Sequence, residues 1–157
     1  MRPGVAIYGL SPGPEVGEAR ELGLAPAMTL TSRVALTKRA PAGHGVSYGH
    51  RYTTSEETSL ALVPLGYADG VPRHLSNLGE VAIAGKRHRI AGAVCMDQFV
   101  LDVGNAAVAA GDEVVLFGPG SSGEPTADEW AAAIGTINYE IVSRVGARVP
   151  RTYEGAP

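Results

Sequence analysis

Four short clusters contain the side chains best suited to chemistry, and three of them are centred on a tyrosine. A tyrosine that ends a strand between small residues can project its hydroxyl into a cleft, where a ligand could meet it. Each tyrosine cluster also has a purely structural explanation: a half-buried tyrosine, a turn at Asp69-Gly70, or a helix that ends at Asn138 in the left-handed conformation. The clusters are Val46-Ser47-Tyr48-Gly49, Gly66-Tyr67-Ala68-Asp69-Gly70, Cys95-Met96-Asp97-Gln98 and Ile137-Asn138-Tyr139-Glu140.

The block Cys95-Met96-Asp97-Gln98 interrupts an apolar pattern that runs over residues 90–94 and resumes over residues 99–101. It holds the only cysteine of the chain and one of its three methionines. A strand pattern that stops for four such residues and then resumes is typical of a corner, or of a bulge that aims side chains at a ligand. Cys95 itself is interpreted as a packed neighbour, not as a nucleophile.

Other catalytic patterns are missing from the sequence. The histidines lack the spacing of metal ligands relative to the cysteine or the acids, so we expect no metal site. The glycine-rich residues 118–123 lack the lysine, and the hydroxyl residue directly after it, that a phosphate-binding loop requires, and no serine lies in a nucleophile elbow. Hydrolases and nucleotide-dependent enzymes are therefore poor candidates. The four histidines are His44, His50, His74 and His88.

Composition places the chain among globular proteins. Its 157 residues are 45% hydrophobic and 18% charged, which suits a packed core in one domain, with room for a fragment of another. The net charge of −3 argues against nucleic acid or an anionic membrane as partner. A single cysteine excludes an internal disulfide and favours a reducing compartment. We expect a cytoplasmic protein without a membrane span.

The hydrophobic pattern predicts a mainly β chain with one clear helix. The run from Met28 to Lys38 predicts a strand with Leu30, Val34 and Leu36 facing inward. Gly85-Lys86 predicts a tight hairpin, and Thr126 with Glu129 predicts a capping box that begins a helix ending near Ile134. Further strands are predicted at residues 59–65, 81–84, 87–94, 99–103, 114–117 and 148–153.

The first residues differ from the remainder. Residues 4–9 predict a short apolar strand without a hairpin partner, and a long segment rich in proline and glycine follows. Such a strand is typical of the end of another domain. We therefore expect the chain to be a piece of a longer protein.

Taken together and in order, the clusters resemble the C-terminal half of the alanine racemase family. The resemblance runs from Arg2 to about Tyr153 and implies the end of a (β/α)8 barrel at residues 1–23, followed by a barrel-like C-terminal β domain at residues 24–157. It also implies isomerase chemistry that interconverts L- and D-alanine with pyridoxal 5'-phosphate. The motifs that carry it are Arg2-Pro3-Gly4-Val5, Tyr8-Gly9-Leu10, the four clusters above and Arg148-Val149-Pro150-Arg151.

The resemblance also implies roles near the cofactor. Tyr48 would be the base that takes the α-proton from L-alanine, opposite a lysine on the other face. Arg2 would hydrogen-bond the pyridine nitrogen, while the N–H groups of Gly4 and Val5 and the hydroxyl of Tyr139 would bind the phosphate. The cofactor lysine of the family lies near the start of its barrel, and neither lysine of this chain corresponds to it. The chain alone is therefore expected to bind no cofactor and to be inactive.

The remaining implied roles concern the substrate. Met96 would present its backbone N–H to the substrate carboxylate, and Tyr67, Arg73 and Tyr139 would line the entrance. The family usually has an arginine where this chain has Ala93, which leaves substrate breadth open. In the family, Tyr48 and Met96 would reach the cofactor of a second subunit, so we expect a head-to-tail homodimer in the intact protein.

Three hypotheses follow from these observations. The chain is part of an alanine racemase, or part of a racemase of broader specificity in which Ala93 marks an altered entrance. Alternatively it is a non-catalytic β domain that serves for binding or dimerisation. The third hypothesis predicts that Tyr48→Phe leaves the activity of the parent protein unchanged.

Overall fold

Alternation of apolar and polar residues produces the strands of this chain, of which the structure describes residues 1–155. In the strand β8, for example, Phe99, Leu101 and Val103 are buried, while the residues between them are partly exposed. The strands are β1 (Leu30–Arg33), β2 (Leu36–Ala40), β3 (Gly45–Val46), β4 (Tyr52–Thr53), β5 (Thr58–Val63), β6 (Glu80–Ile83), β7 (Lys86–Arg89), β8 (Phe99–Gly104) and β9 (Glu113–Phe117).

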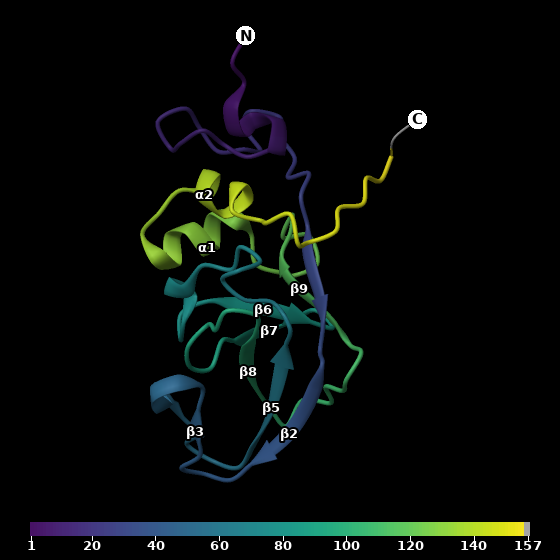
Figure 1. The fold of residues 1–157 in the computed structure, drawn as a ribbon. Helices are drawn as coiled ribbons and strands as arrows, with labels where there is room; N and C mark the ends of the chain where they lie inside the picture. Colours follow the sequence, from purple (N-terminus) through teal and green to yellow (C-terminus); the bar gives the residue numbers. More distant parts are fainter. Residues whose placement is uncertain (156–157) are drawn as a thin grey trace.

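The strands form three antiparallel sheets in the computed structural model (Figure 1). One has the order β1-β9-β6-β7, the second β2-β5-β8, and the third contains only β3 and β4. One hydrophobic core joins the two larger sheets and the helices, and a smaller cluster lies beneath β3 and β4. The prediction of a mainly β fold is confirmed.

The predicted strand from Met28 to Lys38 is two strands in two sheets. The chain changes sheet within two residues: the N–H of Val34 donates to Asp112 beside β9, and the N–H of Ala35 donates to Leu62 of β5. Leu30 and Val34 are buried, as predicted. Leu36 is 49% exposed, and the prediction that it faces inward is wrong, because β2 is an edge strand with most of its residues exposed.

The hairpin between β6 and β7 turns one residue earlier than predicted. Ala84 and Gly85, with φ of 49° and 72°, form the two-residue turn, so Lys86 belongs to β7. The strand β7 also ends at Arg89, not at residue 94. Ile90 keeps a single bridge to β8, and Gly92 then takes a positive φ of 85° where the chain approaches its corner.

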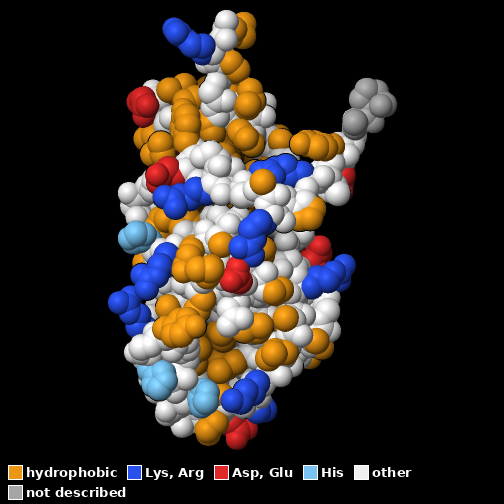
Figure 2. Space-filling view, in the orientation of Figure 1, with side chains coloured by type: hydrophobic (Ala, Val, Ile, Leu, Met, Phe, Trp, Pro, Cys, Tyr) orange, Lys and Arg blue, Asp and Glu red, His pale blue; other side chains and the backbone are white. Residues whose placement is uncertain are grey.

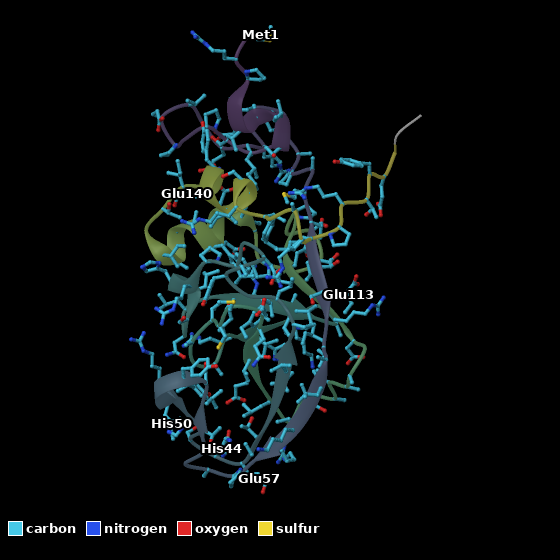
Figure 3. The ribbon with its side chains drawn as sticks, in the orientation of Figure 1. Met1, His44, His50, Glu57, Glu113 and Glu140 are labelled. Carbon is cyan, nitrogen blue, oxygen red and sulfur yellow. The ribbon has the colours of Figure 1, made fainter. Side chains whose placement is uncertain are left out.

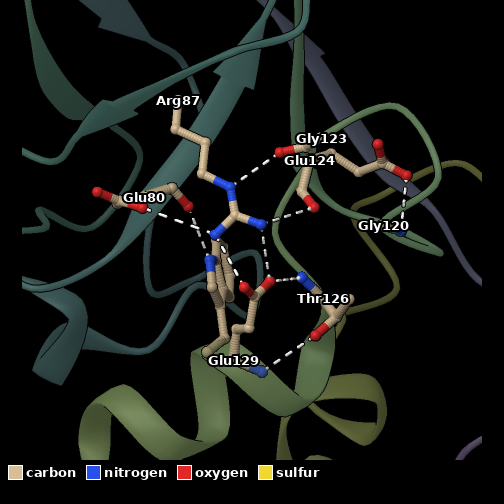
Figure 4. A network of polar contacts seen from close by, with 8 residues as sticks. Glu80, Arg87, Gly120, Gly123, Glu124, Thr126 and Glu129 are labelled. Atoms are coloured by element: carbon tan, nitrogen blue, oxygen red, sulfur yellow. Dashed lines mark hydrogen bonds and ion pairs between the residues drawn. The ribbon is translucent and has the colours of Figure 1, made fainter.

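The helix α1 (Ala127–Ile134) begins at the predicted capping box. The hydroxyl of Thr126 accepts the N–H of Glu129, and the carboxylate of Glu129 accepts the N–H of Thr126. That carboxylate also accepts two hydrogen bonds from Arg87 of β7, so the start of α1 is tied to the sheet (Figure 4). Trp130 packs edge-on against Phe117 at a ring distance of 5.4 Å. In the described part of the chain no helix has the length and apolar character to cross a membrane.

The structure contains a second helix, α2 (Asn138–Ser143), which was not predicted. Gly135 ends α1 in the left-handed conformation, so the alternative in which Asn138 ends a helix is wrong; Asn138 begins one. A helix of six residues contains too few turns to give a periodic signal in the sequence.

Both predicted terminal strands are wrong. Residues Gly4–Tyr8 form a 3-10 helix, because no neighbouring strand in the described chain pairs with them and local hydrogen bonds satisfy the backbone instead. Residues 148–153 are not a strand, since Arg151 folds back to donate to the carbonyls of Val145, Gly146 and Val149.

Candidate functional site

A short arm over residues 41–54, which we call the Tyr48 arm, carries the tyrosine that the sequence singled out. It contains β3, a 3-10 turn at Tyr48–His50 and β4. Tyr48 lies at the turn of this arm and is 80% exposed. A large aromatic side chain this exposed is free to contact a ligand or another chain.

The backbone that presents Tyr48 is strained. Ser47 has φ 63° and ψ −176°, a region that almost only glycine adopts. Its hydroxyl donates to the carbonyl of Ala93 at 2.9 Å and lies 3.4 Å from the Sγ of Cys95. Gly49 and His50 also have positive φ, of 71° and 46°. Side-chain contacts to the corner at residues 93–95 therefore hold an unfavourable turn in place.

The structure brings four of the predicted site residues into one open hollow of about 600 Å³. Tyr48 comes from its arm, Tyr67 and Arg73 from the loop that follows β5, and Met96 from the corner before β8. Within the described residues, the N–H of Met96 donates to no backbone or side-chain acceptor. A free N–H beside an arginine and two phenols can bind a carboxylate. The other lining residues are Ala93, Val94, Cys95, Asp97 and Gln98.

The loop at residues 66–70, which we call the Tyr67 loop, contacts the corner at residues 93–98 through backbone hydrogen bonds. The N–H of Tyr67 donates to the carbonyl of Cys95, and the N–H of Ala68 to that of Met96, both at 3.0 Å. A Cβ on Gly66 would lie 2.2 Å from the carbonyl oxygen of Met96, so only glycine fits there. The two clusters, 30 residues apart in sequence, are thus one structural unit.

Arg148 was not predicted to act at the hollow, although the motif around it was noted. Its Nε lies 3.3 Å from Oδ1 of Asp69, which is buried, and its Nη2 donates to Oδ1 of Asp97 at 2.7 Å. Asp69 also accepts the N–H of Gly66. Arg148 therefore links the Tyr67 loop to the corner, and the two carboxylates have a structural task there. A paired Asp-Arg across two motifs cannot be assigned from a single sequence.

The second group of predicted site residues lies around the N-terminal segment. Gly4 has a φ of 58°, and no atom lies within 4 Å of the position that a Cβ would take. The N–H groups of Gly4 and Val5 begin the 3-10 helix, where no earlier carbonyl of that helix can accept them. The Tyr139 hydroxyl, from α2, lies near this segment, 3.4 Å from the carbonyl of Pro12. Arg2 is exposed.

The residues that line the hollow at Tyr48 and the second group, around the N-terminal segment, lie apart in the same chain. Met1, next to Arg2, and Glu140, next to Tyr139, are in the upper part of the molecule, whereas His50, two residues after Tyr48, is near the lower end (Figure 3). The hollow at Tyr48 contains none of the second group. A separate hollow of about 280 Å³ contains Tyr139 together with residues 11–14, but not Arg2, Gly4 or Val5, so the structure does not gather the second group into one cavity.

These features define a mainly β domain that contributes to sites without enclosing one. The sequence pattern described as "Alanine racemase, C-terminal domain" matches residues 27–153. The alanine racemase of Frankia casuarinae is 73% identical over 153 residues, which are 98% of this chain and 40% of the relative. The chain belongs to the alanine racemase C-terminal domain family.

Solved structures agree with this assignment. The alanine racemase of D-cycloserine-producing Streptomyces lavendulae matches with a TM-score of 0.94 at 58% identity, over 98% of this chain and 40% of that one. The alanine racemase of Bacillus anthracis with bound L-Ala-P matches with a TM-score of 0.86 at 41% identity, over 95% and 38%. The chain spans about 40% of the length of the curated relatives it matches.

Proposed function

We propose that this chain is the C-terminal β domain of an alanine racemase that interconverts L- and D-alanine with pyridoxal 5'-phosphate. The observation that carries the proposal is the hollow lined both by the exposed Tyr48 and by Met96, whose N–H has no acceptor within the described residues. A racemase needs a proton acceptor on one face of the α-carbon and a fixed site for the carboxylate. Membership of the family supports the same reaction. We further propose a cytoplasmic location, in keeping with the single cysteine.

The residues of the second group fit part of the cofactor. Arg2 offers a cation, and Gly4 and Val5 offer N–H groups that have no acceptor within residues 1–155. Tyr139 offers a hydroxyl whose only partner there is a long hydrogen bond, 3.4 Å, to the carbonyl of Pro12. Such donors suit a phosphate monoester and a pyridine nitrogen. The two lysines lie elsewhere, in β2 and β7. The lysine that anchors the cofactor must therefore come from a preceding barrel domain, and this chain by itself is expected to be inactive.

Each of these residues has its own proposed role in the reaction. Bound pyridoxal 5'-phosphate supplies the electron sink that makes the α-proton acidic. Tyr48 takes that proton from L-alanine and returns one when the reaction runs the other way. Met96 fixes the substrate carboxylate through its N–H, and Tyr67, Arg73 and Tyr139 narrow the entrance. Arg2 would hold the pyridine nitrogen by a hydrogen bond and, as a cation, would disfavour its protonation.

The separation of the two groups supports a head-to-tail homodimer. Because Tyr48 and Arg2 lie towards opposite ends of one chain, each pairs with the complementary group of a second subunit. The N-terminal segment also exposes apolar side chains, and Figure 2 shows hydrophobic residues gathered over that segment and down the same face. Such a surface suits contact with the barrel domains. Its large exposed apolar residues include Ile7, Val16 and Leu22.

Tyr48→Phe in the full-length racemase tests the proposed function. It should lower kcat by about a hundredfold or more, since the variant keeps the ring and loses only the group that moves the proton. Tyr153→Phe is the matched control, because Tyr153 is equally exposed, at 82%, and lies outside the hollow. Unchanged kcat in Tyr48→Phe would favour the non-catalytic binding module instead.

A broader specificity is the second candidate. Ala93 lines the hollow with a small side chain where the family usually has an arginine. If this widens the entrance, kcat/KM for serine and larger amino acids should approach that for alanine, and Ala93→Arg should restore the preference. Equal discrimination in both proteins would exclude this candidate.

A further inference from the structure

The Tyr48 arm has little structure of its own to fix the tyrosine. Its strands β3 and β4 pair over only two residues each, Gly45 with Thr53 and Val46 with Tyr52. At its base, the N–H of Gly43 donates to Thr54 and that of Thr54 to His44. A hairpin this short is only marginally stable alone. The place of Tyr48 must therefore depend on contacts between the arm and the rest of the domain.

Two contacts hold the returning side of the arm: Asn77 donates to the carbonyl of Arg51 at 3.0 Å, and Tyr52 ties the strand β4 itself to the β2-β5-β8 sheet. Tyr52 lies directly across from Val46, and its ring packs with the smaller hydrophobic cluster of Ala40, Val46, Leu60 and Ala91. Its hydroxyl donates to Oδ2 of Asp102, on β8, at 2.5 Å. The arm is thus bonded to the same strand that begins just after the Cys95–Gln98 corner.

Asp102 is itself a fixed acceptor. Its other oxygen, Oδ1, accepts the hydroxyl of Thr58 at 2.5 Å and the N–H of Gly104 at 3.0 Å. Burial favours the neutral acid, but the hydrogen bonds from Thr58 and Tyr52 outweigh it and hold the pKa of Asp102 below its usual range. The hydrogen bond to Asp102 and burial raise the pKa of Tyr52 to about 12. Both shifts favour the arrangement in which the Tyr52 hydroxyl donates to the ionised Asp102.

We propose that Tyr52 and Asp102 form a positioning pair that sets the distance and direction of Tyr48 relative to the substrate. The proposal rests on the proposed function, since it assumes that Tyr48 moves the proton. Neither residue lines the hollow, so the pair acts through the arm and not on the substrate. A displacement of about 1 Å at a reacting group can cost two orders of magnitude in rate, so a remote tether can matter for catalysis.

The test compares two variants that each remove one hydroxyl from the same carboxylate. Tyr52→Phe keeps the packed ring and removes the bond to the arm. Thr58→Val keeps the shape of the side chain and removes the bond within the β5–β8 sheet, which does not touch the arm. Tyr48→Phe is measured beside them to test the assumption.

Two readouts distinguish positioning from general destabilisation. Hydrogen exchange of the full-length racemase should show faster exchange at the N–H groups of Gly43 and Thr54 in Tyr52→Phe, with no change there in Thr58→Val. In the full-length racemase, kcat should fall about tenfold in Tyr52→Phe and less than twofold in Thr58→Val. The melting temperatures of both variants should fall by similar amounts.

The isotope effect gives the sharpest result. L- and D-alanine have equal free energies, so kcat/KM must fall equally in both directions and cannot identify the affected face. If Tyr48 is displaced, the primary isotope effect with α-deuterated L-alanine should rise, because Tyr48 removes that deuteron. With α-deuterated D-alanine it should fall towards one. Equal effects in Tyr52→Phe and Thr58→Val, or none in Tyr52→Phe, would overturn the proposal. If Tyr48→Phe stays active, the proposed function fails, and the positioning role fails with it.

Discussion

At the scale of single residues, several side chains around the hollow hold other groups in place instead of reacting. Ser47 keeps a backbone conformation with φ 63° and ψ −176° through its hydroxyl contacts to the corner. Arg148 joins the carboxylates of Asp69 and Asp97. A strained backbone conformation such as that of Ser47 persists only where the surrounding contacts force it, and such conformations are concentrated at functional sites. Its location next to Tyr48 agrees with the proposed role of that tyrosine.

Two substitutions of Ser47 separate strain from hydrogen bonding. Ser47→Ala loses the hydroxyl contacts and keeps a side chain in the strained region, whereas Ser47→Gly loses the same contacts and relieves the strain. Although glycine raises the entropy of the unfolded chain, we expect Ser47→Gly to be more stable than Ser47→Ala by about 1 kcal/mol. Urea unfolding of the two variants measures the difference. The opposite order would show that the turn is not strained.

At the scale of elements, the start of α1 depends on the charge of Glu129. Burial would raise the pKa of Glu129, but the hydrogen bonds from Arg87 and Thr126 outweigh it and lower the pKa below 4.5. A depressed folded-state pKa contributes stability that is present above the unfolded-state pKa and is lost as pH falls through the folded-state value. The link between α1 and β7 should therefore weaken in acid.

The pH dependence of Glu129→Gln checks this. At about pH 6 the variant should be less stable than the natural chain by about 0.5 kcal/mol, a small value because both partners of the ion pair are partly exposed. Near pH 3 the difference should vanish. Chemical denaturation across this pH range provides the measurement. A constant difference would mean that the helix cap does not titrate.

Local signals in the sequence determine part of this architecture. The capping box at Thr126 and the alternation in β8 are local, and both were predicted correctly. The change of sheet after Val34 was not predicted from the sequence, because it depends on the carbonyl acceptors of Asp112 and Leu62, which are distant in sequence. The sequence also singled out the corner residue Met96. It could not show the contact of Met96 with the loop that carries Tyr67, because the two segments are distant in sequence. The roles given to these residues remain predictions.

At the scale of the whole molecule, the separation of the two groups has a direct consequence for assembly. Arg2, Gly4 and Val5 belong to the N-terminal segment, and the Tyr139 hydroxyl contacts Pro12 of that segment. Tyr48 occupies the arm that also carries His44 and His50, and these two histidines lie at the opposite end of the molecule from Met1 (Figure 3). If each catalytic site takes Arg2, Gly4, Val5 and Tyr139 from one subunit and Tyr48 from another, no subunit is active alone. In a two-fold symmetric dimer both sites are then composed in the same way.

Mixed dimers can reveal this arrangement. We combine full-length racemase subunits that carry Arg2→Ala with subunits that carry Tyr48→Phe, each nearly inactive as a homodimer, and allow them to exchange. In a mixed dimer with shared sites, one site receives both defects and the other receives none. Since half of the dimers are mixed after random exchange and each has one intact site, about a quarter of the natural activity should return. If each subunit builds its own site, every site keeps one defect and mixing restores nothing. The control mixes two Tyr48→Phe preparations, which must stay inactive under either arrangement.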